Sequence, residues 1–168
     1  MAKVLIVYDS LTGNTEKMAK AVEQGTREAD ANVRLKKVNE AELSDLEWAD
    51  GIIIGSPTHS GTMSQKTNAF FITRAAKIWE KLENKVGAAF TSSLGTGTGA
   101  EAATLSLITA MILYRMIIVS APEREPGWTG TYGVIADGLI AIGSPDEKAL
   151  DTCRRLGKRV ADVAKKLA

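Results

Sequence analysis

Ser10-Leu11-Thr12-Gly13-Asn14-Thr15 is the stretch of this sequence that decides the fold. It follows a short apolar run rich in β-branched residues, positions 4–8, which is typical of a strand buried on both faces. After it, apolar and small residues recur at helical spacing, at Met18, Ala21, Val22 and Gly25. The stretch is therefore predicted to be the turn from a buried strand into a helix.

The side chains of this turn suit an anion. Free N–H groups at the start of a helix, together with the positive end of the helix dipole, attract negative charge. Three hydroxyls and an amide are added by Ser10, Thr12, Asn14 and Thr15. A nucleoside triphosphate loop needs Gly-Lys-Ser/Thr, and this turn has no lysine or arginine. A site for one phosphate monoester is predicted; the alternative is a helix cap in a polar turn.

Length and composition describe an ordinary globular chain. Its 168 residues correspond to one domain, and 45% hydrophobic and 24% charged residues are typical of a globular protein. A net charge of +1 gives no sign of a nucleic-acid partner or of an anionic membrane. No apolar run is long enough to span a membrane, and the chain enters its first strand directly, so a cytoplasmic protein is expected.

The single cysteine, Cys153, lies on an apolar stripe of the last predicted helix. It has no partner for an intrachain disulfide, which agrees with a reducing compartment. Buried packing is expected in preference to redox chemistry, because a thiol on an apolar stripe has a raised pKa and little access.

Strand and helix patterns alternate five times along the chain. The predicted strands cover residues 4–8, 33–36, 51–56, 85–90 and 116–119. Between and after them, helices are predicted after residue 15, in a short turn within 39–48, over 63–84, over 100–115, and at the end, with Ser144 as N-cap and Pro145 at the first helical position.

This alternation predicts an α/β fold, a three-layer α/β/α sandwich around a five-stranded parallel sheet. The second strand alternates apolar and charged residues, so it belongs at an edge, which fits the strand order 2-1-3-4-5. Loops rich in Gly, Ser and Thr follow the first, third and fourth strands, at 10–15, 57–62 and 92–99. Because these strands are parallel, the three loops are expected to meet at the carboxyl edge, where open sheets of this kind bind ligands.

At residues 10–15 the sequence resembles the flavodoxin-like flavoproteins, whose Ser/Thr-x-Thr-Gly-Asn-Thr loop holds the phosphate of FMN. Pro57-Thr58, Met63-Ser64 and Ser92-Ser93-x-Gly95-Thr96-Gly97 are similar to the WrbA-type NAD(P)H:quinone oxidoreductases within this group. The chain departs from those reductases in lacking a long insertion after the second strand. It also has His59-Ser60 where they have an Arg-Phe pair, and Tyr114 where they have a histidine.

The resemblance implies FMN as cofactor, NAD(P)H as co-substrate, and a quinone or other small molecule as electron acceptor. The residues it implies for binding FMN are Ser10, Leu11, Thr12, Gly13, Asn14 and Thr15 for the phosphate, and Pro57, Thr58, His59, Ser60, Gly61, Ser92, Ser93, Leu94, Gly95, Thr96 and Gly97 for the rest of the molecule. No metal site is expected. Two alternatives remain: a flavodoxin that carries single electrons between redox proteins, and a non-redox domain that binds a phosphate ligand.

Three further features carry functional hypotheses. His59, the only histidine, lies in the second loop and is a candidate proton donor to a quinone, or else a surface residue that shields the flavin edge. Trp128 and Tyr132, in a long loop after the fifth strand, either cover the ring or anchor the loop. The helix within 102–116 is apolar on more than one face, which predicts a homo-oligomer.

Overall fold

A single sheet forms the centre of the molecule. The computed structural model describes residues 1–95, 97–121 and 140–168. Within these ranges seven strands form the sheet: β1 (Lys3–Tyr8), β2 (Asn32–Lys37), β3 (Gly51–His59), β4 (Thr62–Met63), β5 (Val86–Ser93), β6 (Ile117–Ile118) and β7 (Ile140–Ile142). The order along the sheet is β2-β1-β3-β5-β6, with β4 paired to β3 and β7 paired to β5.

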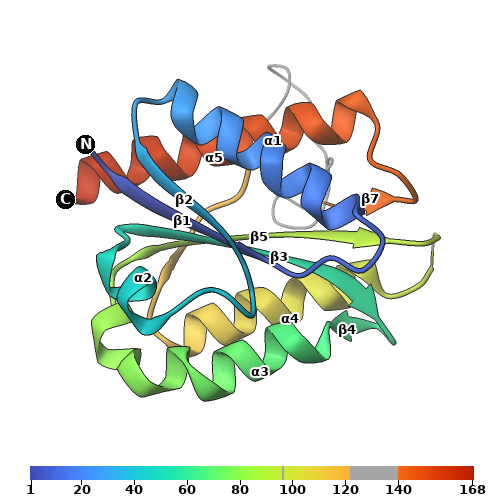
Figure 1. Ribbon diagram of the computed structural model, residues 1–168, viewed down its shortest axis with the longest axis horizontal. Coiled ribbons are helices and arrows are strands. Elements are labelled where there is room, and N and C mark those ends of the chain that lie inside the picture. Colours follow the sequence, from blue (N-terminus) through green and yellow to red (C-terminus); the bar gives the residue numbers. More distant parts are fainter. Residues whose placement is uncertain (96, 122–139) are drawn as a thin grey trace.

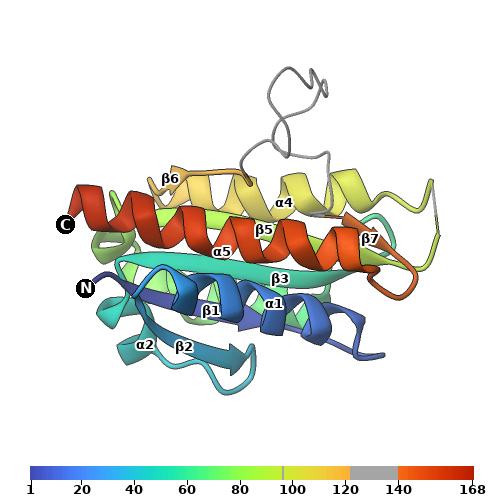
Figure 2. The same cartoon turned by 90° about the horizontal axis from the view of Figure 1, so that it is seen from above.

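Helices cover both faces of the sheet (Figures 1 and 2). One face is covered by α1 (Asn14–Glu28) and α5 (Glu147–Leu167). The other face is covered by α2 (Leu43–Trp48), α3 (Gln65–Thr73), the 3₁₀ helix η1 (Ala75–Leu82) and α4 (Ala100–Leu113). The predicted three-layer sandwich is confirmed, and so is the predicted order of its five strand positions, with β2 at an edge.

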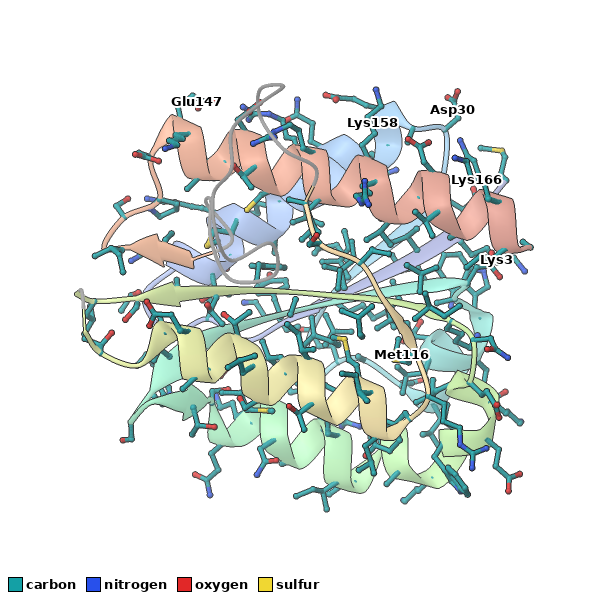
Figure 3. All side chains as sticks on the ribbon, turned by 180° about the vertical axis from the view of Figure 1, so that it is seen from behind. Lys3, Asp30, Met116, Glu147, Lys158 and Lys166 are labelled. Atoms are coloured by element: carbon teal, nitrogen blue, oxygen red, sulfur yellow. The ribbon has the colours of Figure 1, made fainter. Side chains whose placement is uncertain are left out.

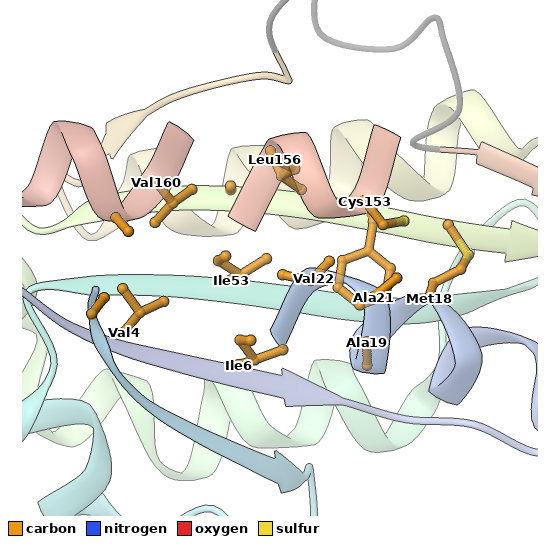
Figure 4. Close-up of a cluster of buried hydrophobic side chains, with 14 of the residues drawn as sticks. Val4, Ile6, Met18, Ala19, Ala21, Val22, Ile53, Cys153, Leu156 and Val160 are labelled. Carbon is orange, nitrogen blue, oxygen red and sulfur yellow. The ribbon is translucent and has the colours of Figure 1, made fainter. Parts of the chain in front are cut away.

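Alternation along β1 divides its side chains between two buried cores. Val4 and Ile6 pack with α1 and α5, in the cluster drawn in Figure 4. Leu5 and Val7 pack on the opposite face, against the helices α2 to α4. A strand that buries both faces shows the continuous apolar run from which it was predicted.

Two glycines bring α1 and α5 into close contact. A Cβ at Gly157 would lie 2.1 Å from the carbonyl oxygen of Val22 and 2.7 Å from Oγ1 of Thr26. A Cβ at Gly25 would lie 1.8 Å from the carbonyl oxygen of Arg154. No side chain fits at either position, so the two helices pack backbone to backbone.

The charged outer side of α5 carries Glu147, Lys158 and Lys166 (Figure 3).

The prediction of one continuous fifth strand is wrong. β6 pairs with the start of β5, at Val86 and Gly87, and β7 pairs with its end, at residues 91–93. Two short segments therefore share the fifth position of the sheet, and the chain between them includes residues 122–139, which lie outside the described residues. The sheet is also not wholly parallel, because β4 is antiparallel to β3.

Two predicted helix boundaries also need correction. The helix expected over 63–84 is interrupted: Met63 belongs to β4, and α3 ends before Arg74, whose guanidinium donates hydrogen bonds to the carbonyls of Val38 and Asn39. The final helix is capped by Asp146, which accepts a hydrogen bond from the N–H of Ala149 at 2.8 Å. Aspartate caps as well as serine, and here its carboxylate reaches the amide three residues ahead.

Cys153 is fully buried, as predicted, on the side of α5 that faces α1 (Figure 4). Burial raises the pKa of its thiol to about 12, with only a small opposing effect from Arg154. In the described ranges, no helix has both the length and the hydropathy needed to cross a bilayer.

Candidate functional site

The three polar loops leave the sheet at the same edge, the right-hand edge in Figure 1. β1 leads into the first loop, the β3–β4 hairpin forms the second, and β5 leads into the third. β1 and β3 are neighbours, as are β3 and β5, so the loops are adjacent in space. The convergence expected from the sequence is present.

The first loop opens onto α1 with free backbone donors. Gly13 is the N-cap and has φ 91°, a left-handed conformation that glycine adopts without strain. The hydroxyl oxygen of Ser10 accepts hydrogen bonds from the N–H groups of Gly13 (3.1 Å) and Glu16 (3.3 Å). The N–H groups of Asn14 and Thr15 have no partner among the described residues. These two amides are the donors that an anion would meet.

Thr15 differs from the other polar residues of this loop, because its hydroxyl faces inward. Its side chain is buried, and Oγ1 lies 2.8 Å from Oγ of Ser92 on β5. Thr12 is exposed, and Ser10 and Asn14 are partly exposed. The side chains available to a ligand in solvent are therefore those of Ser10, Thr12 and Asn14.

The second loop is a tight β-hairpin. Thr58 pairs with Met63 and His59 with Thr62, which leaves Ser60 and Gly61 as a two-residue turn. Both turn residues have positive φ, 51° and 76°, as in the turn type that matches the twist of paired strands. Pro57, Thr58 and His59 are thus strand residues, whereas the sequence predicted loop. His59 is exposed at the end of β3.

The third loop begins later than expected, because Ser92 and Ser93 are the last residues of β5. Their strand conformation is stabilised by neighbours on both sides: Ser92 is in register with Pro57 of β3 and with Ala141 of β7. Beyond them Leu94 is 85% exposed, and Leu11 on the first loop is 79% exposed. Gly97 has φ 70°, and Thr96 lies outside the described residues.

Specific contacts join the third loop to each of the other two. The first and third are joined by the hydroxyl pair of Thr15 and Ser92. The second and third touch at glycine, since a Cβ at Gly99 would lie 2.7 Å from Cα of Gly61. The start of the first loop is joined to β3 by the N–H of Asp9, which donates to the carbonyl of Gly55 at 3.0 Å. The loops therefore form one structural unit.

Ser106 on α4 also contacts the β3–β4 hairpin, a role that the residues around Ser106 in the sequence do not indicate. Its hydroxyl oxygen accepts from the N–H of Met63 at 3.2 Å and donates to the carbonyl of Ala103 at 2.7 Å. Ser106 lies 43 residues from Met63 in the chain, so no local sequence pattern predicts the contact. The dipeptide Ser60-Gly61, in contrast, is a turn signal from which the hairpin could have been predicted.

The donor set fits FMN. Residues 9–16, 56–64 and 91–99 contain no lysine or arginine, so a phosphate would be held by amides and hydroxyls alone. Oγ1 of Thr58 is the one buried side-chain oxygen or nitrogen in the described part of the chain without a hydrogen-bond partner. A buried polar atom without a partner is costly, and a ligand group would relieve that cost.

At the base of the first loop, burial and the charge of Glu16 raise the pKa of Tyr8.

Trp128 and Tyr132 lie outside the described residues, so both of their proposed roles stay predictions. In the described part of the chain, no group of three or more His, Cys, Asp or Glu side chains is arranged to hold a metal ion.

Known proteins of similar sequence and structure place the chain in a family. A family model described as a flavodoxin domain matches residues 5–111. A protein of Aquifex aeolicus named flavodoxin is 38% identical over 164 residues, covering 96% of this chain and 86% of the relative. A protein of Archaeoglobus fulgidus named NAD(P)H dehydrogenase (quinone) is 38% identical over 195 residues, covering 99% of this chain and all of the relative.

A solved structure agrees with these sequences. The crystal structure of the flavodoxin, WrbA-like protein from Agrobacterium tumefaciens has a TM-score of 0.79 and 28% identity, and covers the whole of both chains. The family match covers more than half of the 168 residues, and the Archaeoglobus relative matches along the whole of its length. The chain belongs to the flavodoxin family.

Proposed function

We propose that this chain binds FMN at the carboxyl edge of its sheet and reduces quinones with electrons from NAD(P)H. The observation that carries the proposal is that residues 10–15, which include no charged side chain, contact the end of β5, whose loop in turn contacts the β3–β4 hairpin. The name of the Archaeoglobus relative supports the reaction. Bound FMN supplies the redox chemistry by accepting two electrons from the reduced nicotinamide and passing them to the acceptor.

The chain's own residues bind and orient the cofactor in this proposal. The residues of the first loop hold the phosphate, through the amides of Asn14 and Thr15 and the hydroxyls of Ser10 and Thr12. The hairpin residues 57–61 and the residues 93–95 and 97, at and beyond the end of β5, flank the ring. Exposed Leu11 and Leu94 offer apolar surface beside it. NAD(P)H is abundant in the cytoplasm and the single cysteine needs no oxidising compartment, so we propose a cytoplasmic enzyme.

The decisive test uses the purified full chain loaded with FMN. We expect a flavin absorption spectrum, one FMN per chain by mass spectrometry, and oxidation of NADH or NADPH that depends on added benzoquinone. The apo chain is the control for reaction without the protein-bound flavin. A chain that binds no flavin, or that binds FMN and leaves both nicotinamides unoxidised, would contradict the proposal.

A second function, that of an electron carrier between redox proteins, is favoured by the Aquifex relative named flavodoxin. Alignment to the Archaeoglobus relative extends over 195 positions, more than the 168 residues of this chain, whereas alignment to the Aquifex flavodoxin extends over 164. By this measure the chain lacks segments that the reductase carries. If only a flavodoxin reductase protein reduces the bound flavin, and NADH and NADPH alone do not, the carrier function is the correct one.

We also propose that the chain self-associates through the outer side of α4. Residues 102–114 contain no charged side chain, yet Ile112 is 58% exposed and Leu113 is 71% exposed. Two identical faces of this kind meet without like-charge repulsion. Glu101 precedes the uncharged run and Arg115 follows it, so an antiparallel pair of α4 helices would set opposite charges side by side at both ends.

A further inference from the structure

Ser92 is assigned to the cofactor ring by its place in the third loop, but its contact lies elsewhere. Its side chain is only 6% exposed, and its hydroxyl lies 2.8 Å from that of Thr15, a residue 77 positions earlier in the chain. Thr15 is itself only 1% exposed. The pair is thus an internal link from the fourth position of the sheet to the first turn of α1.

This link is the main polar attachment of that first turn. Among the described residues, the Thr15–Ser92 pair is the only side-chain hydrogen bond from residues 14–17 to a strand of the sheet. Ser10 bonds the amides of Gly13 and Glu16 from within the loop, and these contacts do not reach the sheet. The direction in which the free amides of Asn14 and Thr15 point therefore depends on Ser92.

We propose that Ser92 is a positioning residue for the phosphate of FMN, and that it acts through Thr15 rather than by contact with the ring. Its hydroxyl fixes the first turn of α1, so that the N–H groups of residues 14 and 15 are directed together at the phosphate before it arrives. This inference rests on the proposed binding of FMN. It predicts that Ser92 matters to the ester phosphate and not to the isoalloxazine.

FMN and riboflavin differ only in that phosphate, so their two dissociation constants separate the two ends of the site. For Ser92→Ala we expect the affinity for FMN to fall by about tenfold, the worth of one buried hydrogen bond between neutral groups. The affinity for riboflavin stays within about twofold of the wild type. Thr15→Val gives the same pattern, and Thr15→Ser, which keeps the hydroxyl, restores the affinity for FMN.

A matched control lies one residue away. Thr91 on the same strand forms a buried hydroxyl pair with Thr104 of α4, also at 2.8 Å, and this pair does not reach the first loop. Thr91→Val removes a comparable hydrogen bond of β5, so it reports any general loosening of the strand. We expect it to leave the ratio of the two flavin affinities unchanged, even where it lowers the melting temperature.

A double variant tests whether Ser92 acts through Thr15. If it does, Thr15→Val combined with Ser92→Ala binds FMN no more weakly than Thr15→Val alone. The proposal is overturned if Ser92→Ala lowers the affinities for FMN and riboflavin by the same factor, if it changes neither, or if the two substitutions add independently.

Failure of the proposed function would look different. In that case the wild-type chain binds neither FMN nor riboflavin, and inorganic phosphate becomes the probe, followed by the NMR shifts of the Asn14 and Thr15 amides. A phosphate response that Ser92→Ala abolishes and Thr91→Val retains would support the role of Ser92. An equal response in all three chains would overturn it.

Discussion

His59 ends β3 one residue before the hairpin turn, and its ring is exposed. Histidine can give up a proton near neutral pH, and a quinone that accepts two electrons must also take up protons. We expect His59→Gln to slow quinone reduction by about a hundredfold, the lower end of the range for general acid catalysis. The measurement is kcat for benzoquinone, alongside the affinity for FMN, which stays unchanged.

The cross-strand neighbour of His59 supplies the control. Thr62→Val alters the hairpin opposite His59 without removing a titratable group. We expect it to keep the wild-type kcat. A His59→Gln variant with wild-type turnover would show that the ring only covers the flavin edge.

Gly157 tests how far the core depends on backbone contact. Gly157→Ala puts a methyl group 2.1 Å from the carbonyl oxygen of Val22. Because that oxygen belongs to the backbone, the clash is relieved only if α1 and α5 move apart. We expect a loss of about 1–3 kcal/mol from overpacking, reduced by up to about 1 kcal/mol through the better helix propensity of alanine. Urea unfolding measures the difference, and Lys158→Ala, at an exposed position of α5, is the control. A variant as stable as the control would contradict the backbone contact.

The buried thiol of Cys153 lowers the free energy of unfolding as pH rises in the alkaline range. Its pKa is raised by burial to about 12, whereas an unfolded thiol ionises near pH 9. Between these values the native state keeps a proton that the unfolded state releases, so the free energy of unfolding falls as pH rises. The slope contributed by this one group reaches about 1.4 kcal/mol per pH unit.

The measurement is urea unfolding between pH 8 and pH 11, with Cys153→Ala beside the wild type. We expect the wild type to lose stability more steeply than the variant above pH 9. Tyr8 and Tyr114, whose pKa values are also raised by burial, contribute equally to both chains. Parallel curves would mean that the thiol ionises in the native state.

At the scale of an element, Asp45 attaches the short helix α2 to the edge strand β2. Its carboxylate accepts hydrogen bonds from Arg34 Nη1 at 2.9 Å and from the N–H of Glu42 at 3.0 Å, and Lys36 Nζ lies at 2.9 Å. Burial opposes ionisation, but these three partners outweigh it and lower the pKa of Asp45. The carboxylate thus neutralises two cations on a strand that has solvent on one side.

We expect Asp45→Asn to cost about 2 kcal/mol at pH 7, because the hydrogen bonds lost are to a charged group. Since the pKa is lowered in the native state, the contribution of Asp45 is fully present above the unfolded pKa near 4 and is lost as pH falls from there through the lower native pKa. Unfolding measured at pH 3, 5 and 7 should therefore show a smaller difference in stability between the two chains at pH 3 than at pH 7. Glu83→Gln, which breaks the exposed pair with Arg115, is the control and should cost less than about 1 kcal/mol.

The elements that the sequence predicted correctly are those whose signal is local. The apolar run of β1 and the helical spacing of α1 are properties of consecutive residues. The bounds of β1 and the start of α1 lie within two residues of their predicted positions. The strand ends were missed because their stabilising partners are distant. Ser92 and Ser93 look like loop residues, but Ser92 is strand because β3 and β7 lie on either side of it, and Ser93 is strand because it pairs with β7.

The candidate site divides in the same way. The order of strands and polar loops along the chain was enough to predict that three loops meet at one edge of the sheet, whereas the anion site at the start of α1 stays a prediction. The inward turn of the Thr15 hydroxyl was not predictable, because its partner is 77 residues away and either hydroxyl suits solvent equally well. The unpartnered Oγ1 of Thr58 likewise depends on the packing around the hairpin, which no local pattern encodes.

For the whole molecule, the uncharged face of α4 predicts association of the native chain. Leu105, Thr109 and the exposed Leu113 follow one another at a spacing of four residues in α4, so their side chains lie in one stripe along the helix. Exposed apolar stripes of this kind are rare on monomers and are stabilised by a partner surface. We expect sedimentation velocity of the FMN-loaded chain to give a mass of at least two copies at micromolar concentration.

Charge placed on the exposed outer side of α4 should dissociate the copies without unfolding them. Ile112→Asp combined with Leu113→Asp sets like charges against each other across a symmetric interface, so we expect a monomer whose far-ultraviolet circular dichroism matches the wild type. Ile72→Asp is the matched control, because Ile72 is also exposed, at 64%, but lies on α3. If the wild type is a monomer at about 100 μM, where even weak contacts with affinities near −5 kcal/mol begin to show, then α4 presents its apolar side to something other than a second copy of this chain.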